Sequence, residues 1–161
     1  MSKNPFPDIK FILDVHLGKL ARSLRLFGFD AYCDPNFNDN EIISYAGAYK
    51  RIILTRDKEL LSRKEVIDGF RVLSQDPDEQ LKEVIRRFDL ISRVNPFIRC
   101  MECNGPLEEV TKEEIIDRLF PKTREFYSNF KRCTVCARIY WEGSHYERMR
   151  KYVDSVIKDV N

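Results

Sequence analysis

The sequence predicts an α/β protein in which a parallel sheet is followed by a small zinc ribbon and a C-terminal helix. Short apolar runs alternate with helical patterns four times before residue 95, as expected for a parallel sheet covered by helices on both faces. Two Cys-x2-Cys pairs then use four of the five cysteines. We therefore expect a first domain over residues 1–95 and a second over residues 96–161.

Each predicted strand is a short apolar run, and each predicted helix carries apolar residues at helical spacing. We expect strands at 10–14, 29–33, 51–55 and 69–73, and helices at 16–27, 40–49, 58–64 and 77–88. Gly28 closes the first helix, Asn38 or Asp39 caps the second, and Pro77 starts the fourth. The ribbon is expected over residues 97–142, followed by a polar helix over 144–159 that packs back on the first domain.

The two Cys-x2-Cys pairs supply four thiolates, which is the ligand set of a closed structural zinc site. The alternatives are a redox pair or two disulfides. A redox pair normally opens a helix after a strand, whereas Asn104-Gly105-Pro106 forces a turn after the first pair. We predict one Zn²⁺ bound by Cys100, Cys103, Cys133 and Cys136, and a buried free thiol at Cys33.

Composition excludes some classes of protein. No apolar run approaches the length of a membrane span, and residues 1–7 contain no apolar signal core. We expect a soluble protein of the reducing cytoplasm, where zinc thiolates persist. The formal net charge of +2 does not by itself indicate nucleic-acid binding, and the sequence does not predict the oligomeric state.

The distribution of basic residues is more informative than their number. Residues 118–138 carry six basic residues against one acid, and residues 15–29 carry three basic residues and no acid. Each cluster is either solvated surface or a site for phosphates. The expected nucleic-acid contacts are Lys19, Arg22, Arg25, Arg56, Arg132 and Arg138. The i, i+3, i+6 spacing of the first three predicts that they share one side of a helix.

Acidic residues follow the predicted strands. Asp14 ends the first strand, Asp57 follows the third, and Asp39 and Glu41 flank the start of the second helix. Because parallel strands end at one edge of a sheet, these acids are expected to meet there. The alternative to a metal-binding role for Asp39 and Asp57 is that each side chain only caps a helix. Oxygen ligands suit Mg²⁺ or Mn²⁺, ions that activate water and orient a phosphodiester.

The stretch Leu-Asp14-Val-His-Leu-Gly18-Lys19-Leu-Ala-Arg22 resembles the opening of PIN-like ribonuclease domains of the Mut-seven C-terminal type. Further similarity lies in Asp39-Asn-Glu41, in Thr55-Arg56-Asp57 and in the two cysteine pairs with the closing Tyr140-Trp141-Glu-Gly143-Ser-His145. The resemblance implies a PIN-type α/β/α nuclease fold with an appended zinc ribbon that helps bind RNA. It also implies that Asp14, Asp39 and Asp57 hold a catalytic Mg²⁺ or Mn²⁺, with Glu41 nearby.

The resemblance thus predicts a metal-dependent ribonuclease. A non-catalytic RNA-binding or ribosome-associated adaptor and a toxin-type PIN nuclease are the alternatives. Asp76 and Asp78 are the two candidates for a fourth acidic ligand of the catalytic metal. Trp141 either stacks on a base or packs the ribbon against a helix, and His145 is the alternative zinc ligand to a cysteine.

Overall fold

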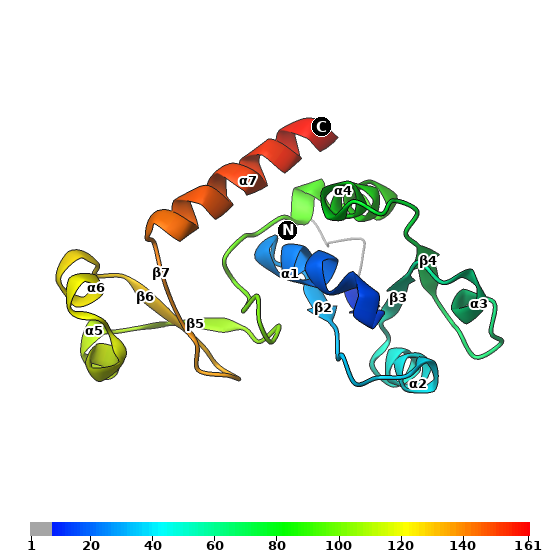
Figure 1. Ribbon diagram of the computed structural model, residues 1–161, viewed down its shortest axis with the longest axis horizontal. Helices are drawn as coiled ribbons and strands as arrows, with labels where there is room; N and C mark the ends of the chain where they lie inside the picture. Colours follow the sequence, from blue (N-terminus) through cyan, green and yellow to red (C-terminus); the bar gives the residue numbers. More distant parts are fainter. Residues whose placement is uncertain (1–7) are drawn as a thin grey trace, which may run out of the picture.

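A parallel sheet forms from the four apolar runs that the sequence predicts as strands. The computed structural model describes residues 8–161, so residues 1–7, the start of the predicted first domain, lie outside the described residues. The strands are β1 (Lys10–Leu13), β2 (Asp30–Tyr32), β3 (Ile52–Thr55) and β4 (Gly69–Arg71), in the order β2-β1-β3-β4 and all parallel (Figure 1).

The helices that connect these strands have identifiable start signals. A 3-10 turn, η1 (Val15–Leu17), leads into α1 (Gly18–Leu26), and α2 (Asp39–Tyr49), α3 (Lys58–Leu61) and α4 (Pro77–Arg87) follow the later strands. The side chains of Asn38, Asp57 and Asp76 accept hydrogen bonds from backbone N–H groups and cap α2, α3 and α4. A second 3-10 turn, η2 (Ile91–Arg93), ends this part of the chain.

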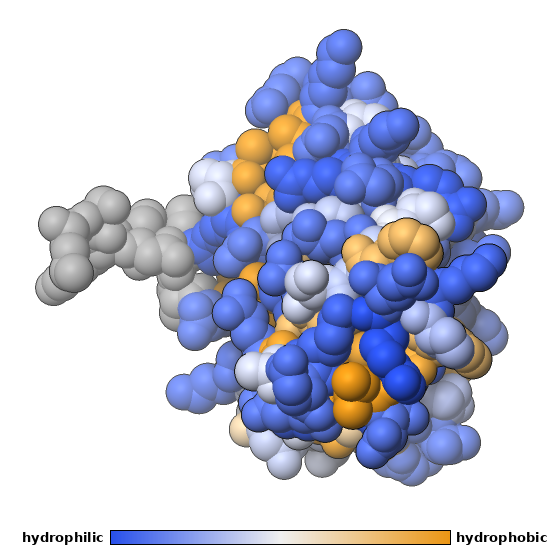
Figure 2. Space-filling model, turned by 90° about the vertical axis from the view of Figure 1, so that its left-hand side faces the viewer, coloured by the Kyte–Doolittle hydropathy of each residue, from blue (hydrophilic) through white to orange (hydrophobic). Residues whose placement is uncertain are grey.

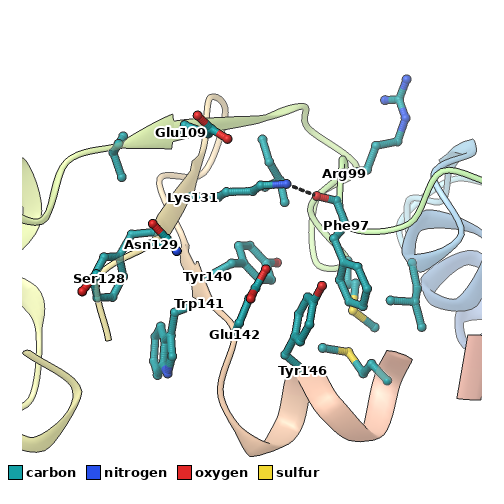
Figure 3. A pocket seen from close by; sticks show the side chains of 16 residues that line it. Phe97, Arg99, Glu109, Ser128, Asn129, Lys131, Tyr140, Trp141, Glu142 and Tyr146 are labelled. Carbon is teal, nitrogen blue, oxygen red and sulfur yellow. Dashed lines mark hydrogen bonds between the residues drawn. The ribbon is translucent and has the colours of Figure 1, made fainter. Parts of the chain in front are cut away.

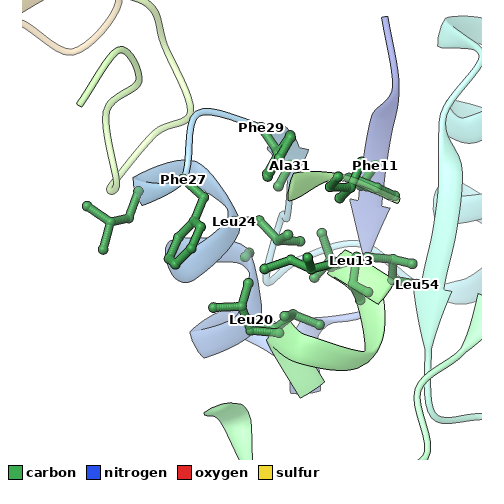
Figure 4. Close-up of a cluster of buried hydrophobic side chains, with 14 of the residues drawn as sticks. Phe11, Leu13, Leu20, Leu24, Phe27, Phe29, Ala31 and Leu54 are labelled. Carbon is green, nitrogen blue, oxygen red and sulfur yellow. The ribbon is translucent and has the colours of Figure 1, made fainter. Parts of the chain in front are cut away.

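Both faces of the sheet are covered at its centre, which explains why the two central strands, β1 and β3, are almost continuously apolar. On one face, Phe11 and Leu13 pack against α1, α4 and the C-terminal helix α7 (Ser144–Val160) (Figure 4). On the other face, Ile12 and Ile53 pack against α2 and Leu60. Val153 and Val156 of α7 are buried in the first of these cores, so the C-terminal helix belongs to the packing of the parallel sheet.

The second sheet is antiparallel and follows the linker. It contains β5 (Leu107–Val110), β6 (Phe130–Cys133) and β7 (Ile139–Trp141), in that order. Between β5 and β6 lie α5 (Lys112–Ile115), η3 (Ile116–Arg118) and α6 (Pro121–Phe126), which the sequence analysis did not predict. Ile115, Leu119 and Phe130 form a small core of their own under these helices.

The order of the parallel strands sets the position of a topological switch point. The chain passes from β1 to β2 on one side of the sheet and from β3 to β4 on the other. The connections therefore diverge between β1 and β3, and in open α/β sheets ligands bind at the carboxyl ends of strands at such a switch point. The predicted fold class is confirmed: a parallel sheet with helices, an antiparallel sheet that carries the four cysteines, and a C-terminal helix.

Candidate functional site

Asp14 and Asp57 stand on the two sides of the switch point. Asp14 follows β1 directly, and its backbone N–H extends the β1–β3 ladder by donating to the Leu54 carbonyl at 3.1 Å. The Thr55 hydroxyl connects the two acids: Oγ1 donates to Asp14 Oδ2 at 3.1 Å and accepts from the backbone N–H of Asp57 at 3.0 Å. Thr55 is fully buried, so this link is held by the sheet.

The carboxylate of Asp57 also has a structural role as a helix cap. Its Oδ1 accepts from the backbone N–H groups of Glu59 and Leu60, at 2.8 and 3.4 Å, and so caps α3. The cap fixes the orientation of the side chain and leaves Oδ2 for a further ligand. Asp14 is similar, because Oδ2 accepts from Thr55 and Oδ1 remains. Both predicted roles of Asp57, cap and site acid, are thus compatible in one side chain.

Asp39 and Glu41 lie in the first turn of α2, exposed to solvent. Asn38, not Asp39, is the cap: its Oδ1 accepts from the Glu41 N–H at 2.9 Å, and its Nδ2 donates to Glu41 Oε1 at 3.0 Å. The start of α2 is tied to the region after α3 by a hydrogen bond from Arg63 to Asn40. The start of α2, which carries both acids, therefore lies at the same end of the sheet as α3.

The acids do not form a preassembled cluster. Among residues 8–161, the four cysteines are the one group of three or more His, Cys, Asp or Glu side chains close enough to share an ion. Mg²⁺ needs few direct carboxylates because it retains several waters, so an open arrangement of hard oxygen donors fits this ion. Of the two candidates for a fourth acid, Asp76 caps α4 and Asp78 accepts a hydrogen bond from Tyr152 at 2.6 Å.

The four predicted zinc ligands come together. The sulfur atoms of Cys100, Cys103, Cys133 and Cys136 all lie within 4.8 Å of one another, with pairs at 3.3 and 3.7 Å. Sulfur atoms around a tetrahedral zinc are separated by about 3.8 Å, given Zn–S bonds of about 2.3 Å. The cluster is therefore consistent with structural zinc. His145 is not among these residues; it lies at the start of α7.

Backbone groups around the cluster favour thiolate ligands. The N–H groups of Val135 and Cys136 each point at Cys133 Sγ at 3.4 Å, and the N–H of Gly105 points at Cys103 Sγ at the same distance. Burial disfavours the Cys133 thiolate, but the N–H groups of Cys136 and Val135, with the neighbouring Cys103 and Cys136 side chains, outweigh it and lower its pKa to about 7. Burial raises the pKa of Cys103 and of Cys136, so without a metal the cluster holds its protons unevenly. A side chain at Gly105 would meet Cys133 Sγ at 2.8 Å, so the turn requires glycine.

The segment that carries the first cysteine pair, residues 100–104 (the first hook), is docked on the edge strand β2. Asn104 Oδ1 accepts from the Ala31 N–H at 3.0 Å, and Arg25 Nε donates to the Ala31 carbonyl at 2.8 Å. Two side chains thus satisfy backbone groups that a further strand would otherwise pair with. Arg25 also donates to the carbonyl of Met101 at 2.9 Å, which ties the first hook to α1.

An ionic network surrounds this docking contact. Asp30 accepts from Asn104 Nδ2 at 2.7 Å and from Arg51 at 2.6 Å, and Arg99 lies at 4.0 Å. Burial of Asp30 raises its pKa, but the hydrogen bonds from Arg51 and Asn104 and the charges of Arg51 and Arg99 outweigh this and lower the pKa below its ordinary value. The carboxylate is therefore held in its charged form.

The expected phosphate contacts fall into different environments. Lys19 and Arg22 are exposed on α1 and line an open groove with Arg148 and His145 of α7, although Arg22 also pairs with Glu102. Arg56 is exposed between β3 and Asp57, and Arg138 is exposed at the second cysteine pair. Arg132 pairs with Glu108 at 3.0 Å across the ribbon sheet.

The prediction that Arg25 shares an exposed face with Lys19 and Arg22 is wrong. Arg25 is only 6% exposed, and its guanidinium donates to three backbone carbonyls, those of Ala31, Met101 and Glu102. Six residues of α-helix rotate a side chain by about 120° from its starting direction, so an i, i+6 pair does not share a face. Arg25 holds the first hook in place and is not available as a phosphate contact.

Cys33 is half-buried beside the site, with its Sγ 3.9 Å from the Asp14 carbonyl oxygen. Burial raises the pKa of its thiol, and the nearby Arg25 charge only partly offsets that effect. A protonated, packed thiol agrees with the structural role expected from the sequence.

The parallel sheet, the four-cysteine ribbon and the C-terminal helix define an α/β protein with an appended ribbon that could hold a metal ion. The family model of the Mut7-C RNAse domain matches residues 9–153, which is nearly the whole chain, and the chain belongs to this family. No curated protein and no solved structure shows a significant match. None of the helices described between residues 8 and 161 has the length and apolar character needed to span a bilayer.

Sequence reasoning missed the contribution of α7 to the groove and of the linker to a cavity under the ribbon. His145, Arg148 and Tyr146 come from the start of α7, and Phe97 from the linker. Ser144–Arg150 combines His145, Arg148 and Arg150 with the aromatic Tyr146, which was the available signal. Where α7 packs decides which of them line a cavity, and that packing is a tertiary property.

Proposed function

We propose that this protein is a metal-dependent ribonuclease whose catalytic centre is the switch point between β1 and β3. The observation that carries the proposal is the placement of Asp14 and Asp57 on the two sides of that point, joined through the buried Thr55. Membership in an RNase family makes RNA the expected substrate. In this proposal residues 1–95 form the nuclease unit, and residues 96–161 form the zinc ribbon with its helix.

Asp14 and Asp57, with Asp39 and Glu41 from α2, are the residues that would hold Mg²⁺ or Mn²⁺. Such an ion supplies an acidified water and neutralises charge on phosphate oxygens. Lys19, in the first turn of α1, and Arg56, beside Asp57, are exposed next to this edge. They would position the phosphodiester and stabilise the negative charge that develops on it during hydrolysis.

The remaining residues would support binding. Lys19 and Arg22 with Arg148 line the groove along α1 and α7, so RNA phosphates would follow this groove away from the acids. Arg138 would extend the basic surface to the ribbon. The end of the molecule formed by the ribbon is largely hydrophilic, with small apolar patches between the polar side chains (Figure 2). We place this activity in the cytoplasm, because four zinc thiolates require a reducing compartment.

The decisive experiment compares wild type with Asp14→Asn on single-stranded and structured RNA, in Mn²⁺, in Mg²⁺ and without added divalent ion. Asp14→Asn keeps the shape of the side chain and removes its charge. It should reduce cleavage at least a hundredfold, while RNA binding is unchanged or tighter because a repulsive charge is lost. Asp117→Asn, at an exposed position in η3, is the matched control and should cleave normally.

One observation favours a second candidate, a non-catalytic RNA-binding adaptor. The acids of residues 8–161 form no cluster, and Asp14, Asp39 and Asp57 line neither the groove nor the cavity described below. The adaptor reading predicts RNA binding without metal-dependent cleavage. Cleavage that is equal in wild type and Asp14→Asn would reject the proposed mechanism and identify a contaminating nuclease.

A further inference from the structure

An aromatic cavity of about 420 Å³ lies between the ribbon sheet and the start of α7. It is within the size range of small-molecule and cofactor sites. Its walls come from four places in the chain: the end of α1, the linker at 97–101, the ribbon strands and the first turns of α7. Neither the acids of the switch point nor the zinc ligands line it, so it is separate from both sites described above.

The walls present flat aromatic surfaces. Phe97 and Tyr146 pack against each other with ring centroids 4.2 Å apart, and Tyr140 and Trp141 approach from β7 (Figure 3). Trp141 is supported by Phe130, at a centroid distance of 6.4 Å, so its ring is held against the ribbon core while it lines the cavity. Both roles considered for Trp141 in the sequence analysis are therefore compatible with its position.

Two contacts connect the walls of the cavity to other parts of the structure. The Tyr140 hydroxyl lies 3.0 Å from Cys100 Sγ, which connects one wall to the cysteine cluster. Lys131 Nζ donates to the Phe97 carbonyl at 2.9 Å and so joins the ribbon sheet to the linker. Walls that are fixed before a ligand arrives reduce the entropy lost on binding.

Polar groups lie among the aromatic ones. Glu142 is placed between Trp141 and Tyr146, with Glu109 and Asn129 nearby (Figure 3). A carboxylate between two flat rings is suited to a planar ligand that carries an amino group at its edge. Adenine, cytosine and guanine have such a group, and uracil has none. Unpaired bases in RNA are recognised by this combination of stacking and edge hydrogen bonds.

The basic groove adjoins the cavity. Leu26, Met101 and Met149 line both, while Lys19, Arg22 and Arg148 line the groove alone. Seven residues of α1, about 10 Å of helix, separate Lys19 from Leu26. A strand whose phosphates follow the groove would thus reach the cavity.

We propose that this aromatic cavity binds an unpaired base of the RNA whose phosphates lie in the basic groove, with Glu142 accepting from the amino group of the base. The inference rests on the proposed RNA substrate and adds a requirement for a single-stranded segment away from the cleavage point. It makes Tyr146 and Trp141 stacking residues and Glu142 a specificity residue.

The experiment uses the fluorescence of Trp141, the one tryptophan of the chain. Full-length, zinc-loaded Asp14→Asn protein is titrated, without added divalent ion, with ten-nucleotide oligo(A), oligo(C) and oligo(U), with duplex RNA and with polyphosphate. Oligo(A) and oligo(C) should change the fluorescence saturably and bind more tightly than oligo(U). Duplex RNA and polyphosphate should bind in the groove and leave the fluorescence unchanged.

Variants distinguish base stacking from electrostatic attraction between basic residues and phosphates. Tyr146→Ala should weaken oligo(A) binding roughly tenfold or more and leave polyphosphate binding unchanged, while Tyr146→Phe should restore it. Tyr49→Ala, on the exposed surface of α2, is the control and should bind normally. Glu142→Gln should reduce the preference for oligo(A) over oligo(U). Circular dichroism and zinc content verify that each variant is folded.

The outcomes distinguish this inference from the proposed function. Cleavage by wild type without any fluorescence response to single strands would overturn the base site and leave the nuclease intact. A saturable response without cleavage would support the base site in an adaptor. Equal binding by Tyr146→Ala and wild type, or an equal response to duplex and single strands, would also overturn it.

Discussion

Replacement of Asn104 tests whether its side chain holds the ribbon on the parallel sheet. Asn104 is 8% exposed, has a φ of 72°, accepts from the Ala31 N–H and donates to Asp30. Asn104→Ala leaves the Ala31 N–H unpaired, which costs about 1–3 kcal/mol, and removes a hydrogen bond to a charged group. The left-handed φ adds about 1 kcal/mol for alanine. We expect a total loss of about 4 kcal/mol.

Asn104→Gly separates the two contributions. It removes the same hydrogen bonds but accepts the positive φ, so it should be about 1 kcal/mol more stable than Asn104→Ala. For a chain of this size, a loss of about 4 kcal/mol corresponds to a fall in Tm of roughly 8–16 °C. Thermal unfolding by circular dichroism measures this, with zinc content determined on the same samples and the exposed Asn36→Ala as control.

Two results would refute the reasoning about Asn104. An Asn104→Ala protein within about 1 kcal/mol of wild type would mean that water or a neighbouring group satisfies Ala31. A glycine variant less stable than the alanine variant would mean that the backbone conformation contributes nothing.

Three further predictions concern the metal, the linker and acid stability. Purified protein should contain one zinc per chain, and Cys136→Ser should lose it and unfold the ribbon; elemental analysis with less than half an equivalent in wild type would contradict this. Gly28→Ala should destabilise the fold by roughly 3 kcal/mol in urea, because Gly28 has a φ of 96° and an added Cβ would collide with the Asn95 carbonyl. Gly47→Ala, inside α2 with its nearest neighbour at 3.9 Å, is the control and should be neutral or stabilising. Because the folded pKa of Asp30 is lowered, its contribution to stability is present above the unfolded value of about 3.9 and is lost as pH falls through the folded pKa. Urea titrations from pH 6 to pH 2 should show this loss of unfolding free energy in wild type and a smaller loss in Asp30→Asn. If the unfolding free energy falls equally with pH in both proteins, Asp30 is not the group responsible.

The sequence predicted the parallel sheet well because its signals are local. Apolar runs such as Phe11–Leu13 have to be buried on both faces, and caps such as Asp57 and Asp76 mark helix starts directly. Boundaries were less accurate: the helix expected over 58–64 ends at Leu61. The helices between β5 and β6 were missed although Thr111 and Glu114 form a capping box, a signal that was present in the sequence.

The candidate site could be predicted only in part. Strand-end positions identified Asp14 and Asp57 as neighbours, because topology alone brings parallel strand ends to one edge. Helical spacing separates Arg25 from Lys19 but could not show what Arg25 binds, because two of its three carbonyl partners lie more than seventy positions away in the sequence. The aromatic cavity depends on how α7 meets the ribbon, and no local pattern encodes that contact.

With the zinc proposed for the four cysteines, the docking of the first hook links the protection of the β2 edge to the metal supply. The backbone N–H of Ala31, on the outer edge of β2, is satisfied by Asn104, which belongs to the loop that the cysteines fold, and Arg25 joins the Ala31 carbonyl to the same loop. Chains that have not yet acquired zinc would expose this edge as a template for pairing with other chains. We therefore expect protein made without zinc to be lost to aggregation or proteolysis faster than zinc-loaded protein, so that the amount of folded protein would follow zinc availability.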